Sequence, residues 1–133
     1  MVETLEFHHT GLLVKNIEHS LKHYTEVFWK VNVSPVYEIL TQGVKVCFVK
    51  NGINSYLELV KASSEESVVN SMMKKRISYY YIAYKADDFD ETLSEPEGLN
   101  YKSLRAFNSQ AFQMMCCCFL YTPDAQLIEP IEK

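Results

Sequence analysis

The chain carries two matching segments, Phe7-His8-His9-Thr10-Gly11 and Tyr79-Tyr80-Tyr81-Ile82-Ala83, which superpose with an offset of 72 residues (79 − 7). Nearly the same offset, 71 residues (129 − 58), places Leu57-Glu58 on Ile128-Glu129. Each match is short, but two nearly equal offsets across both halves indicate an internal repeat. The chain is therefore expected to contain two copies of one structural unit.

In each half, the pattern of apolar residues predicts a strand, a helix and three further strands, βαβββ. The first copy comprises a strand over 5–15, a helix capped by Asn16, and strands over 36–40, 44–49 and 55–62. The second comprises a strand over 79–86, a short helix from Phe89 that ends at Pro96, and strands near 102–107, 112–121 and 126–131. We expect one α+β domain over 1–133, with module one over about 5–62, a connecting helix over about 63–76 and module two over about 77–131.

Composition and charge exclude several classes of protein. The chain is 47% hydrophobic and 23% charged, which is typical of a globular protein, and its net charge of −4 disfavours a nucleic-acid partner. No apolar stretch is long enough to cross a bilayer, and residues 1–6 lack the pattern of a signal peptide, so we expect no membrane partner and a cytoplasmic location.

The four cysteines are Cys47 and the run Cys116-Cys117-Cys118. They do not form a Cys-x-x-Cys pair, and a disulfide framework would space its cysteines apart. In a strand, Cys117 would point to one face and Cys116 and Cys118 to the other, and each can pack there as a small hydrophobic side chain. We therefore expect four free thiols with packing roles.

The repeat picks out two pairs of positions for chemistry. His9 and Tyr81 occupy one strand site in the two halves, while Glu58 and Glu129 occupy another and have apolar neighbours on both sides. A carboxylate on a buried strand needs a partner, because burying it unpaired is costly. One histidine and two glutamates form a plausible shell for a divalent ion such as Mn, Fe, Co, Ni or Zn. The sequence predicts metal ligands at His9, Glu58 and Glu129.

Three further side chains are candidates for contacting a substrate: Tyr81 as an aromatic lining, Gln42 beside the turn glycine Gly43, and Arg105 for an anionic group. Turn geometry alone also explains Gln42. The other histidines have simpler interpretations. His8 points to the face opposite His9 and is expected to be structural, whereas His19 and His23 lie on the polar side of the first helix, where a solvated surface role is expected.

Several segments together resemble the vicinal oxygen chelate superfamily, which includes glyoxalase I, methylmalonyl-CoA epimerase, extradiol dioxygenases and the fosfomycin- and bleomycin-resistance proteins. The resemblance covers nearly the whole chain and is greatest to the epimerase branch. It rests on these segments: Phe7-His8-His9-Thr10-Gly11-Leu12-Leu13-Val14, Gln42-Gly43-Val44-Lys45-Val46-Cys47-Phe48-Val49, Tyr56-Leu57-Glu58-Leu59-Val60, Tyr81-Ile82-Ala83-Tyr84-Lys85-Ala86-Asp87-Asp88 and Leu127-Ile128-Glu129.

The resemblance implies that two βαβββ modules build a half-open, cup-shaped sheet with a metal bound by four side chains, here at the positions of His9, Glu58, Tyr81 and Glu129. The epimerase and glyoxalase branches typically have histidine at the position of Tyr81, and a neutral phenol is a poor ligand. Either three protein ligands and water hold the metal, or the site binds none. In the family's chemistry a substrate chelates the metal through two oxygens, and Glu129 is the candidate for moving the proton.

The resemblance implies two functions, and a purely structural or regulatory protein is a third possibility, because fold alone does not determine function. The first is a metal-dependent isomerase or lyase that acts on a small carbonyl or CoA-thioester compound. The second is a protein without a metal that sequesters an aromatic or apolar small molecule, which the nine tyrosines and seven phenylalanines would suit. The resemblance also implies a homodimer, for which exposed sheet edges give a physical reason.

Overall fold

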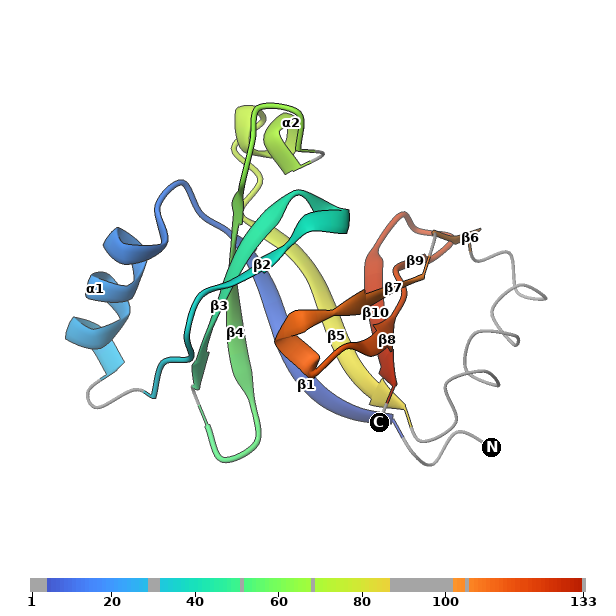
Figure 1. Ribbon diagram of the computed structural model, residues 1–133, viewed down its shortest axis with the longest axis horizontal. Helices are drawn as coiled ribbons and strands as arrows, with labels where there is room; N and C mark the ends of the chain where they lie inside the picture. Colours follow the sequence, from blue (N-terminus) through green and yellow to red (C-terminus); the bar gives the residue numbers. More distant parts are fainter. Residues whose placement is uncertain are drawn as a thin grey trace. The chain divides into compact units, whose positions relative to one another are not determined.

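The computed structural model describes residues 5–28, 32–50, 52–67, 69–86, 102–104 and 106–132. The chain divides into two compact units. The His9 unit comprises His9–Tyr80, and the Glu129 unit comprises Met1–His8 together with Tyr81–Lys133 (Figure 1). Strands β1 (Leu5–Leu13) and β5 (Tyr79–Ala86) each contribute residues to both units.

The sheet of the His9 unit has the order β2-β3-β4-β1. Its other strands are β2 (Tyr37–Ile39), β3 (Val44–Lys50) and β4 (Tyr56–Ala62). Strand β3 is antiparallel to both β2 and β4, whereas β1 pairs with β4 in parallel. A 3-10 turn over Leu40–Gln42 joins β2 to β3, and Gly43 closes it with φ +63°, a conformation that glycine adopts without steric cost.

Helix α1 spans Ile17–Phe28 and begins as predicted, because the Asn16 side chain accepts a hydrogen bond from the backbone N–H of His19 at 2.9 Å. It packs against β3 and β4 (Figure 1). The predicted connecting helix over 63–76 is shorter than expected, since α2 covers only Val69–Lys74. The residues before it form turns, and the Asn70 amide donates to two carbonyls there, those of Ser64 at 2.8 Å and Glu65 at 2.9 Å.

The Glu129 unit is built around β10 (Leu127–Glu132) in the order β5-β10-β8-β7. Strand β10 runs parallel to β5 and antiparallel to β8 (Met115–Cys117) and β9 (Leu120–Tyr121). Strand β7 (Phe107–Ser109) pairs with β8, and β6 (Lys102–Ser103) pairs with β9. The helix predicted from Phe89 lies outside the described residues.

The prediction of one continuous strand over 112–121 is wrong, and two local causes explain the difference. Gln110–Phe112 forms a 3-10 turn in which Ser109 Oγ accepts from Ala111 N at 3.2 Å, and the next two residues have positive φ. Further on, Cys118 N–H donates to the Pro130 carbonyl at 3.2 Å, but proline has no N–H to return the bond. The ladder is therefore interrupted between β8 and β9.

Strand register confirms the internal repeat. In the His9 unit, Gly11 on β1 lies beside Glu58 on β4 in a parallel pair. In the Glu129 unit, Ala83 on β5 lies beside Glu129 on β10, also in a parallel pair. Since Gly11 and Ala83 also correspond in the sequence repeat, each unit places a glutamate at the same point relative to its neighbouring strand. His9 lies two residues before Gly11 on β1, and Tyr81 lies two residues before Ala83 on β5.

Each unit has its own buried side chains. In the His9 unit they include Val46, Cys47, Val49, Leu59 and Val60, and in the Glu129 unit Ala83, Cys117, Leu120, Leu127 and Ile131. All four cysteines are free thiols, as predicted, and Cys47, Cys117 and Cys118 are buried. Across the described residues, no helix combines the length and apolar character needed to cross a membrane.

Candidate functional site

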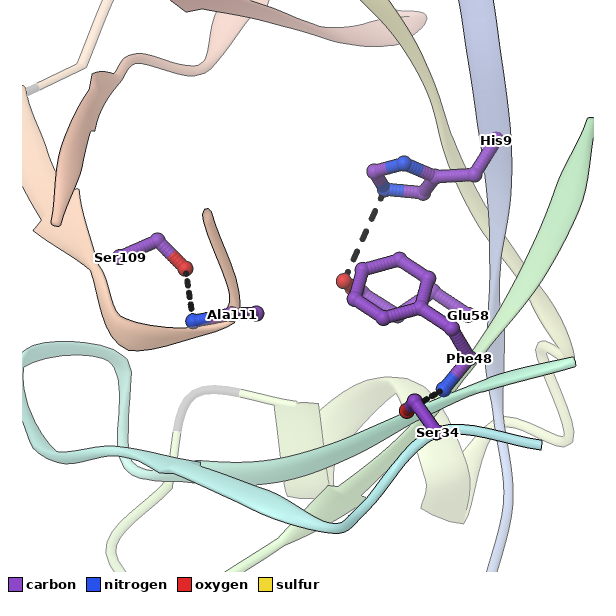
Figure 2. Close-up of polar contacts among 6 residues, drawn as sticks. All are labelled: His9, Ser34, Phe48, Glu58, Ser109 and Ala111. Atoms are coloured by element: carbon purple, nitrogen blue, oxygen red, sulfur yellow. Dashed lines mark hydrogen bonds and ion pairs between the residues drawn. The ribbon is translucent and has the colours of Figure 1, made fainter. Parts of the chain in front are cut away.

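The His9 unit holds a buried pair of ionisable side chains, His9 on β1 and Glu58 on β4. Both are almost inaccessible to solvent, with exposed fractions of 0% and 3%, and His9 Nε2 lies 3.7 Å from Glu58 Oε2 (Figure 2). The parallel register puts Glu58 beside Gly11, two residues after His9, so the two side chains share one face of the sheet. The structure therefore brings these two predicted ligands together, and their binding of a metal stays a prediction.

Burial lowers the pKa of His9, and the nearby Glu58 carboxylate only partly offsets that effect. The imidazole is consequently neutral at physiological pH, which is the form that binds metal ions. The gap of 3.7 Å exceeds a hydrogen bond but can be spanned by two metal–ligand bonds of about 2.1 Å each. By donor chemistry and spacing, His9 and Glu58 fit two positions of a divalent-metal shell.

An aromatic side chain, Phe48 on β3, covers this pair. Its ring meets the His9 imidazole edge-on, with centroids 5.2 Å apart (Figure 2). It meets the Tyr56 ring in the same manner at 6.2 Å. Phe48 lies directly opposite Glu58 in the antiparallel β3–β4 ladder, so both point to the same face. The contact fixes the plane of the imidazole and helps to exclude water from it.

The backbone of Phe48 is held by Ser34, in the segment before β2. Ser34 Oγ accepts the Phe48 N–H at 2.8 Å (Figure 2). The Ser34 N–H donates to the Phe48 carbonyl at 2.9 Å. The Cys47 thiol donates to the Ser34 carbonyl at 3.2 Å. These bonds tie an irregular segment to the strand that carries Phe48.

The Glu129 unit holds a second buried carboxyl, Glu129 on β10, which is 3% exposed. Burial raises the pKa of Glu129 to about 8, and a hydrogen bond from Tyr81 acts in the opposite direction. Glu129 Oε1 is also buried and accepts no hydrogen bond within the described part of the chain. The Glu129 carboxyl is therefore protonated near neutral pH in the metal-free protein, and Tyr81 is its hydrogen-bond donor.

Aromatic rings surround Tyr81 in the same unit. The Tyr81 ring meets Phe119 edge-on at 5.0 Å, and Phe119 stacks on Phe107 at 5.7 Å. Tyr81 itself is only 2% exposed. The phenol is thus packed against Phe119 and hydrogen-bonded to Glu129, and its contact with a substrate stays a prediction.

The remaining sequence predictions have different outcomes. Gln42 is half-buried at the end of the 3-10 turn, and Arg105 lies outside the described residues. Glu129 belongs to a different unit from His9 and Glu58, so the three-ligand metal site stays a prediction. Among the residues that the structure describes, no three His, Cys, Asp or Glu side chains gather within either unit to hold a metal.

Sequence reasoning missed Phe48 and Ser34. A phenylalanine in a strand is unremarkable alone, but strand pairing gives a signal, since Phe48 must lie opposite Glu58 if residues 50 and 56 flank the hairpin. No pattern in the sequence singles out Ser34, because its role depends on a contact formed by an irregular segment.

Comparison with known proteins identifies the family. The family model described as the Glyoxalase/Bleomycin resistance protein/Dioxygenase superfamily matches residues 8–119. The chain belongs to this superfamily, which confirms the resemblance seen in the sequence. No curated protein sequence matches the chain.

Solved structures share the fold over almost the whole chain. A hypothetical protein from Bacillus halodurans C-125 has a TM-score of 0.86 at 24% identity, covering 98% of this chain and 96% of that one. Methylmalonyl-CoA epimerase from Mycobacterium tuberculosis has a TM-score of 0.84 at 19% identity, covering 98% and 88%. A variant of the Streptomyces coelicolor epimerase in complex with 2-nitronate-propionyl-CoA has a TM-score of 0.83 at 19% identity, covering 98% and 99%. These similarities confirm the predicted α+β, glyoxalase-like fold.

Proposed function

We propose that this chain is a metal-dependent isomerase or lyase of the vicinal oxygen chelate type, acting on a small carbonyl or CoA-thioester compound. The observation that carries the proposal is the buried His9–Glu58 pair, with 3.7 Å between Nε2 and Oε2. A neutral imidazole and a carboxylate are donors that divalent transition metals prefer, and one shared ion can bridge the distance between them. The CoA ester bound to one of the epimerases supports the substrate class.

In this proposal His9, Glu58 and Glu129 would hold the ion, which is one of Mn, Co, Ni, Fe or Zn. When bound, such an ion supplies Lewis-acid stabilisation of an enolate-like oxygen. The neutral imidazole of His9 and the two carboxylates give a mixed nitrogen and oxygen donor set that suits these metals. The proposal requires Glu129 to reach the His9–Glu58 pair.

Glu129 is the proposed catalytic base. Its carboxylate would take the proton from the carbon next to the substrate carbonyl, leaving the electron pair of the C–H bond in the enolate, and would later return the proton to that carbon. Tyr81 donates to this carboxyl and is itself packed against Phe119, so the direction of the carboxyl is fixed before substrate binds. Gln42 and Arg105 are the proposed additional substrate contacts.

Metal analysis tests the proposal. The purified wild-type protein is expected to retain a stoichiometric divalent ion, and Glu58→Ala or Glu129→Ala is expected to weaken binding by more than the roughly 10- to 100-fold that loss of an outer-shell partner costs. Elemental analysis and titration with Co²⁺ measure both. Glu38→Ala, at an exposed position on β2, is the control and should bind like wild type. A wild-type protein without the ion, prepared under conditions that preserve such sites, contradicts the proposal.

A second function has one observation in its favour. Tyr81 stands where the family usually has a histidine ligand, and here it donates to Glu129 within a cluster of aromatic rings. Such a lining suits a protein that sequesters an aromatic or apolar molecule without a metal. In both cases we propose a small-molecule ligand and a homodimer in the cytoplasm.

The substitution Tyr81→His separates the two functions. For the proposed enzyme, the native chain already binds Co²⁺, and adding an imidazole ligand should tighten binding by about tenfold, because each additional tethered ligand acts at high effective concentration. Tyr81→Phe adds no ligand and removes the hydroxyl that donates to Glu129, so it should weaken Co²⁺ binding by roughly 10- to 100-fold. If instead the native chain binds no Co²⁺ and only Tyr81→His does, the sequestering function is supported.

A further inference from the structure

Two histidines outside the proposed site lie one helical turn apart on α1. His19 and His23 are separated by four residues, so their Cβ atoms are about 6 Å apart on the same side of the helix. Both side chains are exposed, whereas Ile17 and Leu21 supply the inner, more buried side of the helix. This spacing is the one by which two histidines of a helix bind a single zinc ion in HExxH proteins.

The helix is fixed where the pair begins. Asn16 Oδ1 accepts the His19 backbone N–H at 2.9 Å, which holds the first turn in helical geometry and so preserves the spacing of the two imidazoles. The exposed charges nearby have both signs, with Glu18 and Glu26 on the same helix as Lys22, so the imidazoles themselves supply the affinity for a cation. The pair is therefore preorganised by backbone structure, and both imidazoles are accessible to an ion from solvent.

We propose that His19 and His23 form a surface chelate for a nitrogen-preferring divalent transition-metal ion, Cu²⁺, Ni²⁺ or Zn²⁺. Two imidazole nitrogens occupy two coordination positions, and water completes the shell. Imidazole suits all three ions, and the usual order of stability places Cu²⁺ as the tightest. The site does not depend on the proposed function, since neither histidine lies beside His9 or Glu58.

Cu²⁺ itself is the probe for this site. In ¹⁵N-¹H NMR spectra of the full chain, substoichiometric Cu²⁺ is expected to broaden the amide signals around His19–His23 first. His19→Ala and His23→Ala should each lower the Cu²⁺ affinity of this region by roughly 100-fold, because a chelate loses its second, tethered arm. Glu26→Gln is the matched control, since it alters the same helix without removing an imidazole, and should bind almost as tightly as wild type.

The NMR readout separates this site from the metal site of the proposed function. The surface chelate is supported if the broadening around α1 disappears in the double variant His19→Ala/His23→Ala. Signals near His9 and Glu58 do not enter this comparison. Broadening around α1 that persists in the double variant, or single variants that bind Cu²⁺ as tightly as wild type, overturns it. The two side chains are exposed, so circular dichroism should show an intact fold for every variant.

Discussion

The variant Glu129→Gln is expected to be more stable than the metal-free wild-type protein at pH 9, by on the order of 4 kcal/mol in free energy of unfolding. The pKa of Glu129 is raised from its ordinary value of 4.5 to about 8, mainly by burial. The folded state therefore keeps its proton between these two pH values, while the unfolded chain loses it. Glutamine is neutral at every pH, and its carbonyl still accepts the hydrogen bond from Tyr81.

The sign of the effect follows from proton linkage. Below about pH 4.5 the carboxyl is protonated in both states, so wild type and Glu129→Gln should have similar stability. As the pH rises towards 8, the folded wild type binds more protons than the unfolded chain, and its stability falls. Urea denaturation at several pH values, with a chelator present, measures the divergence. Glu38→Gln, at an exposed carboxylate, is the control, and parallel curves for wild type and Glu129→Gln would refute the prediction.

A bound divalent ion should reverse this ranking. The cation favours the ionised form of a carboxylate that contacts it, so metal-loaded wild type should gain stability that Glu129→Gln cannot gain. The same pair of proteins thus reports whether Glu129 contributes to the proposed metal site. No catalytic assay or known substrate is needed for this comparison.

The internal repeat was sufficient to predict where the two glutamates lie on their strands. Because strand side chains alternate with a period of two, matching His9 with Tyr81 and Glu58 with Glu129 also fixed the face that each occupies. The structure confirms this within each unit, where Gly11 lies beside Glu58 and Ala83 beside Glu129. The period-two pattern is informative here because the glutamates lie on β4 and β10, whose central residues are buried. Neither strand can shift its register without exposing apolar side chains.

Other features depend on contacts that periodicity does not encode. Pro130 interrupts the strand opposite it, and that effect on Cys118 could be foreseen only once the two were known to be paired. The hydrogen bond from Tyr81 to Glu129 required knowing that β5 and β10 are neighbours. Sequence pattern was misleading in one case, since the connecting helix predicted over about 63–76 is longer than α2. There the amide of Asn70 stabilises turns in the preceding segment instead.

Removal of Phe48 should disturb the His9–Glu58 pair. Phe48→Ala deletes a ring that is only 7% exposed, and is expected to lower the free energy of unfolding by about 3–5 kcal/mol. It should also weaken Co²⁺ binding, because the imidazole of His9 loses the ring that holds its plane and water gains access to the pair. Urea denaturation and Co²⁺ titration measure the two effects.

A milder variant separates loss of stability from loss of the site. Phe48→Leu keeps an apolar side chain but loses the edge-on contact with His9, which costs about 0.5–1.5 kcal/mol for an aromatic pair. Phe107→Leu is the matched control, because Phe107 also packs on another ring, Phe119, but belongs to the Glu129 unit. We expect Phe48→Leu to weaken Co²⁺ binding and to move the His9 ring-proton resonances, and Phe107→Leu to do neither. Equal effects of the two variants would mean that Phe48 acts only through global stability, because a positioning role requires its contact with the imidazole.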